Sequence, residues 1–339
     1  MSQTHTATQP GRAGRSRPAP APGTPPGAAR SRRPRGRFTP YLLLFPSVLL
    51  IGGLLLYPMY RMVVMSFQDV GLAQVSGVLP AEGVGADNYT NVLTDPAFWH
   101  ALVNTAVFAF VAVATTLVSG TLVGLLLHRL GRVMSLIVAT GAMLAWGTPQ
   151  ITGAIVFRFL FDDSYGLANQ VMNALPDGLS RTVFGRADWT MHSWVLSTRS
   201  EYLVLLLCVV WMGFPFIAVS VLAGLKSVPE ELYEAARVDG AGAWRSFWSV
   251  TFPMLRPIFS VLIVLSTIWD FKVFTQLYVI NNGVTNKDGF NLSLYSYSKA
   301  FGFGAQMGLG SAIALILTVL LLIITGFYIR QMVRQGETA

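Results

Sequence analysis

The sequence predicts an all-α integral membrane protein with six transmembrane helices. Of its 339 residues, 53% are hydrophobic and only 12% are charged, whereas soluble domains carry roughly one-quarter charged residues. Several uncharged stretches reach the roughly 20 residues that an α-helix needs to cross a bilayer. These stretches lack the two-residue alternation of barrel strands, so helices are the structure that satisfies the backbone in lipid.

Six apolar runs define the predicted spans. Five contain no Asp, Glu, Lys or Arg: residues 42–60, 101–127, 133–157, 202–225 and 307–329. The fifth span in chain order, residues 258–280, contains Asp270 and Lys272. Within the second span, Gly120 and Gly124 have the GxxxG spacing that favours close helix packing inside a bundle.

The charge distribution predicts the orientation of these spans. Residues 1–38 contain eight arginines and no acidic residue, whereas residues 68–100 contain four acidic residues and no Lys or Arg. Because cytoplasmic flanks carry the excess of Lys and Arg, both termini are expected in the cytoplasm of a multi-pass protein of the bacterial cytoplasmic membrane.

Residues 1–38 are expected to form a disordered basic tail, because they lack apolar periodicity. Their charge suits anionic membrane lipid. Nucleic acid is not an expected partner, since no aromatic residues interleave the arginines as a base-stacking surface requires.

The residues of catalytic and metal sites are sparse. Cys208 is the only cysteine, and the four histidines are scattered without a HExxH pattern. Residues 224–227 end like a phosphate-binding loop, but Leu225 stands where the glycine before the lysine is needed, and no GKS or GKT occurs. We therefore expect no enzyme activity, no metal and no cofactor bound by this chain.

The segment 226–257, between the fourth and fifth spans, holds the densest cluster of charges. Ser227 and Glu230 have the S-x-x-E spacing of a capping box, which predicts a helix that begins near Pro229, and Gly240 permits a sharp turn. Aromatic residues at helical spacing then predict one face of a second helix before the prolines that open the fifth span: Trp244, Phe247, Trp248 and Phe252, followed by Pro253 and Pro257. On these grounds alone, an amphipathic helix resting on the inner membrane surface fits equally well.

The same segment resembles a known family motif. Glu234-Ala235-Ala236, three residues, Gly240, nine residues and then Val250-Thr251-Phe252-Pro253 is similar to the EAA loop of permease subunits in bacterial binding-protein-dependent ABC importers. Val250 and Phe252 depart from the usual Ile and Leu. Further carbohydrate-permease-like words extend the resemblance to the maltose-permease-like group over about residues 40–335: "YPMYRMVVMSF", "NYTNVL", "YGLANQVMNAL" and "GLGSAIALIL". The predicted permease domain is therefore residues 39–335, with the EAA loop at 226–257.

This resemblance implies a set of partners and a coupling site. The partners are a second homologous permease in a heterodimer, a cytoplasmic ABC ATPase dimer that holds ATP and Mg, and an extracytoplasmic solute-binding protein. Glu234 would be a polar tether to the ATPase, the two alanines a close-packing surface and Gly240 the turn. The implied coupling residues are Glu234, Ala235, Ala236, Asp239, Gly240 and Pro253.

The candidate substrate path starts from charges at membrane depth, which usually face an aqueous cavity or one another. Its residues are Asp270, Lys272, Trp269, Phe274 and Arg158. The aromatic rings suit stacking on a sugar, so a neutral oligosaccharide is the expected solute. Alternatively, Lys272 extends to the outer surface and Asp270 binds a neighbouring helix. A permease for glycerol phosphate, polyamines or peptides, and an ion-coupled secondary transporter, remain alternatives.

Overall fold

A computed structural model describes residues 39–336. The chain divides into two compact units, with the boundary between Leu56 and Tyr57. The predicted tail, residues 1–38, lies outside the described residues. The first unit contributes α1 (Thr39–Ile51) and the π-helical turn η1 (Gly52–Leu56). Its apolar side chains are exposed, Leu42 by 73% for example, as expected for a helix surrounded by lipid.

The second unit is almost entirely helical. Its one ribbon pairs β1 with β2 antiparallel, Gln68 opposite Gly83 and Asp69 opposite Glu82. In chain order its elements are α2 (Tyr57–Ser66), β1 (Gln68–Asp69), α3 (Leu72–Val75), β2 (Glu82–Gly83), α4 (Asp87–Thr94), α5 (Pro96–Arg129), α6 (Arg132–Trp146), α7 (Gln150–Leu160), α8 (Leu167–Asn173), α9 (Asp177–Phe184), α10 (Thr198–Leu225), α11 (Glu230–Val238), α12 (Ala243–Ser246), η2 (Phe247–Thr251), α13 (Phe252–Phe271), α14 (Thr275–Ile280), η3 (Lys287–Gly289), α15 (Leu292–Phe301) and α16 (Met307–Gly336).

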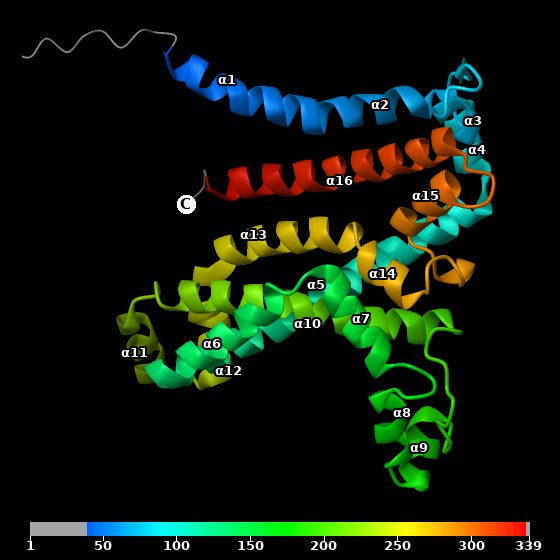
Figure 1. Ribbon diagram of the computed structural model, residues 1–339. Helices are drawn as coiled ribbons and strands as arrows, with labels where there is room; N and C mark the ends of the chain where they lie inside the picture. The colour runs from blue at the N-terminus through cyan, green and yellow to red at the C-terminus, as the bar shows by residue number, and fades with distance from the viewer. Residues whose placement is uncertain (1–38, 337–339) are drawn as a thin grey trace, which may run out of the picture. The chain divides into compact units, whose positions relative to one another are not determined.

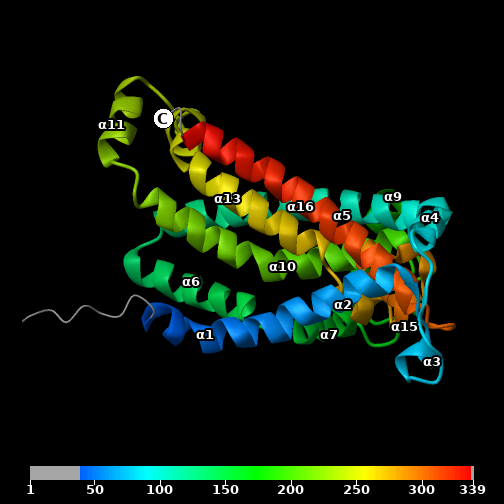
Figure 2. The same cartoon turned by 90° about the horizontal axis from the view of Figure 1, so that it is seen from above.

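The long helices of this unit share a common direction. Helices α10, α13 and α16 run side by side, with α11 at one end of them and α4 and α15 at the other (Figures 1 and 2). Five helices of the described chain are long and apolar enough to cross a membrane: Tyr41–Ser66, Pro96–Arg129, Thr198–Leu225, Ala243–Ile280 and Met307–Arg334. They coincide with the first, second, fourth, fifth and sixth predicted spans.

The third predicted span is not one continuous helix. Residues 133–157 fall on α6 and α7, of 15 and 11 residues, which are separated at Gly147, Thr148 and Pro149. Proline has no N–H for the helix ladder and disfavours helical backbone at the residue before it, so the helix ends there. The six-span count therefore stays a prediction, which holds if α6 and α7 make one crossing between them.

The GxxxG pattern in α5 marks a close helix contact, as predicted. A Cβ atom at Gly120 would lie 2.5 Å from the Cβ of Ile217, and one at Gly124 would lie 2.9 Å from the backbone oxygen of Ala218. Both neighbours belong to α10. The absence of side chains at these two positions of α5 thus allows the backbones of α5 and α10 to approach closely.

The predicted fifth span is also interrupted. Helix α13 ends at Phe271, residues 272–274 are not helical, and α14 begins at Thr275. Lys272 is the C-cap residue of α13 and is exposed. The break places Lys272 at a helix end, where a cation interacts favourably with the helix dipole.

Candidate functional site

The segment 226–257, here called the coupling loop, folds as two short helical stretches joined by a turn. Helix α11 begins at Glu230 with Pro229 as its N-cap, which confirms the predicted start. The predicted capping box is wrong, because the Ser227 hydroxyl donates instead to the Gly224 carbonyl at 2.7 Å. Ser227 therefore closes the end of α10 and does not cap α11.

Gly240 makes the turn after α11, as predicted. Its φ is +73°, in the left-handed region. The Gly240 N–H donates to the Arg237 carbonyl at 3.0 Å and the Ala241 N–H to the Ala236 carbonyl at 2.9 Å. These two bonds form a Schellman motif, which ends a helix with a left-handed residue and favours glycine there.

The predicted coupling residues on α11 do not share one environment. The Glu234 side chain is 64% exposed, with Arg237 Nη2 3.9 Å from its Oε1, and Ala235 and Asp239 are also exposed. Ala236, by contrast, is only 9% exposed. Ala236 thus packs within this chain, and Ala235 is the alanine that a partner could reach.

The second half of the loop carries the predicted aromatic face. The ring centroids of Trp244 and Trp248 are 5.8 Å apart, and those of Trp248 and Phe252 are 5.0 Å apart. Tyr233 ties α11 to this half, since its hydroxyl lies 3.1 Å from the Thr251 hydroxyl. Sequence analysis missed Tyr233, because no local pattern pairs two residues that are 18 positions apart.

The coupling loop continues directly into the bundle. Residues 243–271 are helical throughout, as α12, η2 and α13, with Pro253 in the first turn of α13. Near the start of α13, Leu255 packs so closely on α10 that a Cβ at Gly224 would lie 2.6 Å from its Cδ2. A force on α12 would therefore be transmitted to both α13 and α10.

Asp270 and Trp269, from the candidate substrate path, lie near the end of α13. Asp270 is 7% exposed, and its Oδ2 has no hydrogen-bond partner among the described residues. Trp269 is 41% exposed; its ring meets Phe216 edge-on at 5.4 Å, and Phe216 stacks on Trp146 at 5.5 Å. Three aromatic rings from α13, α10 and α6 therefore form a continuous row, and Asp270 directly follows Trp269 in the chain.

The other candidate path residues lie in different surroundings. Phe274 packs against Tyr278 and Tyr297, with ring centroids 5.5 and 5.1 Å away. The Arg158 Nη1 donates to the Val279 carbonyl of α14 at 3.3 Å. The five predicted residues thus do not gather at one point, and their role in solute passage stays a prediction.

Glu201 is a buried acidic residue that sequence analysis did not single out. It is fully buried in the first turn of α10. Its two carboxylate oxygens accept hydrogen bonds from Asn281 Nδ2 at 2.6 Å and Asn286 Nδ2 at 2.7 Å. Glu201 thereby fixes the loop after α14 to α10. In the sequence, the one sign of this role is that Glu201 is a single acidic residue directly before the apolar run 202–225.

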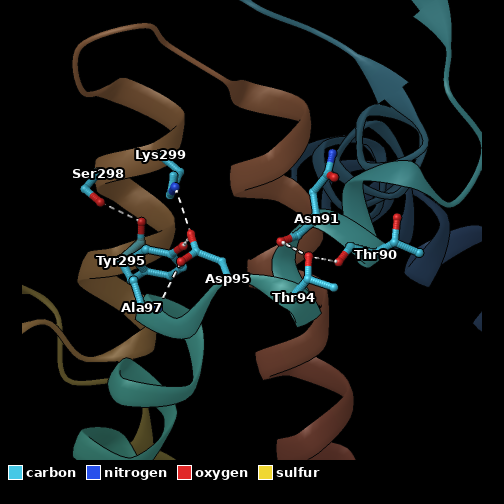
Figure 3. Close-up of polar contacts among 8 residues, drawn as sticks. All are labelled: Thr90, Asn91, Thr94, Asp95, Ala97, Tyr295, Ser298 and Lys299. Atoms are coloured by element: carbon cyan, nitrogen blue, oxygen red, sulfur yellow. Dashed lines mark hydrogen bonds and ion pairs between the residues drawn. The ribbon is translucent and has the colours of Figure 1, made fainter.

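Asp95 plays a similar part at the start of α5. As the N-cap residue, Asp95 accepts a hydrogen bond from the Ala97 N–H at 2.9 Å. Its other carboxylate oxygen accepts from the Tyr295 hydroxyl at 2.5 Å and from Lys299 Nζ at 3.2 Å (Figure 3). Beside it, the Thr94 hydroxyl donates to the Thr90 carbonyl in the last turn of α4. Burial alone would raise the pKa of Asp95, but the hydrogen bonds from Tyr295, Ala97 and Lys299 outweigh burial and lower it. Asp95 therefore ties α5 to α15 in its ionised form.

Residues 162–197, between α7 and α10, form a small lobe with its own aromatic centre. Trp189 stacks on Trp194 at 5.4 Å. The indole of Trp189 donates to the Ser180 hydroxyl at 2.9 Å and that of Trp194 to Asn169 Oδ1 at 2.7 Å. Burial and the nearby Arg186 charge lower the pKa of His192. His192 also contacts Arg186.

The coupling loop and the helices around it belong to a recognised protein family. Residues 120–337 match the family described as the inner membrane component of binding-protein-dependent transport systems. The chain belongs to this family. It is therefore a permease subunit of an ABC transporter, a membrane protein of an importer family, and the resemblance to that family is confirmed. The role of the coupling loop stays a prediction. Family membership excludes the alternative of an ion-coupled secondary transporter.

Similar proteins cover nearly the whole chain. The diacetylchitobiose uptake permease DasB of Streptomyces coelicolor is 38% identical over 91% of this chain and 91% of its own length. The trehalose/maltose permease MalF of Thermococcus litoralis is 29% identical over 86% of this chain and 92% of its own. One chain in a crystal structure of a bacterial ABC transporter involved in alginate import aligns with this permease with a TM-score of 0.70 and 19% sequence identity. The alignment covers 87% of this permease and 94% of that chain. That structural match shows the shared fold.

Proposed function

We propose that this permease translocates a sugar, and specifically a neutral oligosaccharide, across the cytoplasmic membrane as part of an ATP-driven importer. The main support for the transport role is the structure of the coupling loop. Its exposed helix α11 ends at a turn at Gly240, and the helix that follows the turn continues into the bundle. The sugar assignment draws on its relatives, which are named for diacetylchitobiose and for trehalose and maltose.

The coupling loop would dock on a separate ABC ATPase dimer, which binds ATP and Mg. Glu234, Ala235 and Asp239 are the exposed side chains beside the Gly240 turn, and they are the proposed contact. Closure of the ATPase dimer would push α12, and the continuous helix from Ala243 to Phe271 would carry that push into the bundle. Rigid-body movement of packed helices is sufficient for alternating access.

The complete importer would contain two further proteins. A second, homologous permease would complete a heterodimer, and an extracytoplasmic solute-binding protein would deliver the sugar. Both termini would lie in the cytoplasm, since the excess of arginine in residues 1–38 supports that orientation. The coupling loop and the ATPase would then be on the same side of the membrane.

The row of Trp269, Phe216 and Trp146 is the proposed solute-facing surface. Aromatic rings offer an apolar face for a sugar ring, and the nearby Asp270 carboxyl group, with an unpaired oxygen, can accept from a sugar hydroxyl. A phosphorylated solute such as glycerol phosphate fits less well, because the residues of this surface, Trp269, Phe216, Trp146 and Asp270, include no Lys or Arg to pair with a phosphate.

Uptake by the reconstituted transporter tests this function. Proteoliposomes that contain the permease, its partner subunits and the binding protein should accumulate labelled chito- or malto-oligosaccharide only when ATP and Mg are supplied on the ATPase side. Uptake that does not require ATP, or that prefers glycerol phosphate, would contradict the proposal.

A pair of variants tests the aromatic surface. Trp269→Ala should lower uptake by up to about tenfold, since a ring contact contributes about 0.5–1.5 kcal/mol, whereas Trp269→Phe should keep most of it. Equal uptake by the two variants would remove Trp269 from the solute path.

A further inference from the structure

A large groove lies beneath the coupling loop. It has a volume of about 1220 Å³ and is bounded by the end of α5, the start of α13 and the loop itself. Roughly 300–1,000 Å³ is enough for a drug-sized ligand, so this groove can hold something larger. We call it the coupling-loop groove; its apolar wall includes Leu122, Leu125, Trp248, Phe252, Phe259 and Ile263.

The apolar wall lies within helices that can cross the membrane. Leu122 and Leu125 belong to the apolar helix Pro96–Arg129, and Phe259 and Ile263 to Ala243–Ile280. Leu122 is 62% exposed. This part of the groove therefore opens at the depth of lipid chains, where a water-soluble subunit such as the ATPase does not reach.

Three basic side chains line the same groove: Arg129, Lys226 and Arg256. Within the described residues none of the three has a side-chain hydrogen bond or ion pair, and Glu230 is the acidic side chain among the lining residues. Arg129 and Lys226 stand at the C-terminal ends of α5 and α10, where the helix dipole favours a cation. Arg256 lies inside the continuous helix from Ala243 to Phe271, so no helix end accounts for it.

Two of the three basic residues lie at the ends of spans. Arg129 is the last residue of α5 and Lys226 follows the last residue of α10. Trp244 and Trp248, which also line the groove, are the residue type that gathers at the boundary between hydrocarbon and headgroups. The groove thus combines an apolar wall, tryptophans of the kind found at the membrane boundary and basic side chains, which together suit the acyl chains and the phosphate of a phospholipid.

We propose that the coupling-loop groove binds an anionic phospholipid. Its phosphate lies among Arg129, Lys226 and Arg256, and an acyl chain follows Leu122, Phe259 and Ile263. Basic pockets between transmembrane helices on the cytoplasmic side are suited to anionic headgroups.

Photo-crosslinking tests this proposal on the intact transporter. The complex, purified with its partner subunits, is placed in nanodiscs of phosphatidylcholine that carry a trace of phosphatidylglycerol with a photoreactive acyl chain, and the labelled peptides are mapped. We expect label in residues 117–129 and 252–263. Unlabelled phosphatidylglycerol should displace the probe, whereas phosphatidylcholine and inorganic phosphate should not.

Charge variants provide the matched comparison. Arg129→Gln and Arg256→Gln should each reduce labelling about five-fold, the factor that corresponds to about 1 kcal/mol per basic side chain near an anionic surface. Arg256→Lys should retain the label, which separates loss of charge from a folding defect. Arg132→Gln is the control, because Arg132 follows α5 by three positions but does not line the groove.

Several results would overturn the proposal. They are equal labelling by a phosphatidylcholine probe, displacement by inorganic phosphate, an equal loss in Arg132→Gln, and crosslinks from the groove to a partner subunit in place of lipid. Labelling requires no transported solute, so this inference and the sugar-import proposal can fail independently.

Discussion

Gly240 is required for its backbone conformation and not for space, because no atom lies within 4 Å of the position a Cβ would take. At a φ of +73°, a Cβ costs roughly 1–2 kcal/mol. Gly240→Ala should therefore loosen the turn and lower ATP-dependent uptake per ATP hydrolysed. Gly242→Ala is the matched control, since Gly242 has a φ of −69° and is equally free of neighbours. Equal coupling in the two variants would show that the turn does not transmit the signal.

Asp95 gives the protein a component of stability that depends on pH. Its folded-state pKa is lowered, so the folded protein prefers the carboxylate more strongly than the unfolded chain does. That contribution is fully present above the ordinary Asp pKa of about 3.9 and is lost as the pH falls through the lower, folded-state value. Asp95→Ala should lower the free energy of unfolding by about 1 kcal/mol at neutral pH, and the difference from wild type should shrink in acid.

Thermal unfolding across pH measures this effect. Asp87→Asn is the control, because Asp87 is exposed at the start of α4 and its carboxylate has no hydrogen bond among the described residues. A difference between Asp95→Ala and wild type that stays constant from neutral to acid pH would contradict the role of the ionised carboxylate.

Single residues were predictable where their role is local. The turn at Gly240 follows from a backbone preference, which a glycine in a helical context signals. The contacts of Glu201 with Asn281 and Asn286 span 80 and 85 positions, so no sequence pattern indicates them. Ala236 shows the same limit of sequence-based prediction. The sequence places Ala236 in the EAA motif, but its burial depends on residues that come near it only in the folded chain.

At the scale of helices, the α5–α10 contact is the tightest feature that the sequence indicated. Gly120→Ala would place a Cβ 2.5 Å from the Ile217 Cβ and 2.9 Å from the Phe214 backbone oxygen. Overpacking of this kind costs about 1–3 kcal/mol, so the variant should unfold at a lower temperature in detergent. Gly141→Ala is the matched change in α6, where nothing lies within 4 Å, and it should be neutral or slightly stabilising. If both variants unfold like wild type, close approach of α5 and α10 does not limit stability.

The two interrupted helices show why element boundaries are hard to predict. Hydropathy measures only the cost of leaving lipid, and residues 133–157 are uncharged throughout. The break at Pro149 arises from the missing N–H and from the steric effect on Thr148. The break after Phe271 carries no proline, and it separates α13 from α14, which packs against α7. That contact between distant segments is not visible in local sequence.

At the scale of the whole molecule, the coupling mechanism depends on which side of the membrane each loop occupies. The charge bias predicts that the segment after α2 is outside and the coupling loop inside, with α6 and α7 completing a single crossing. An even number of crossings between these two segments would instead put both on the same side of the membrane, and a coupling loop outside the cell could not meet an ATPase in the cytoplasm.

Cysteine labelling in intact cells tests this orientation. Cys208 is fully buried, so the native chain should give little background, and Cys208→Ala removes what remains. Ser76→Cys, in the exposed segment after α3, should react with a membrane-impermeant maleimide added to whole cells. Val238→Cys, at an 88% exposed position on α11, should react only after the membrane is permeabilised. Because the reagent cannot cross the bilayer, reaction of Val238→Cys in intact cells would place the coupling loop outside and overturn both the six-span topology and its contact with a cytoplasmic ATPase.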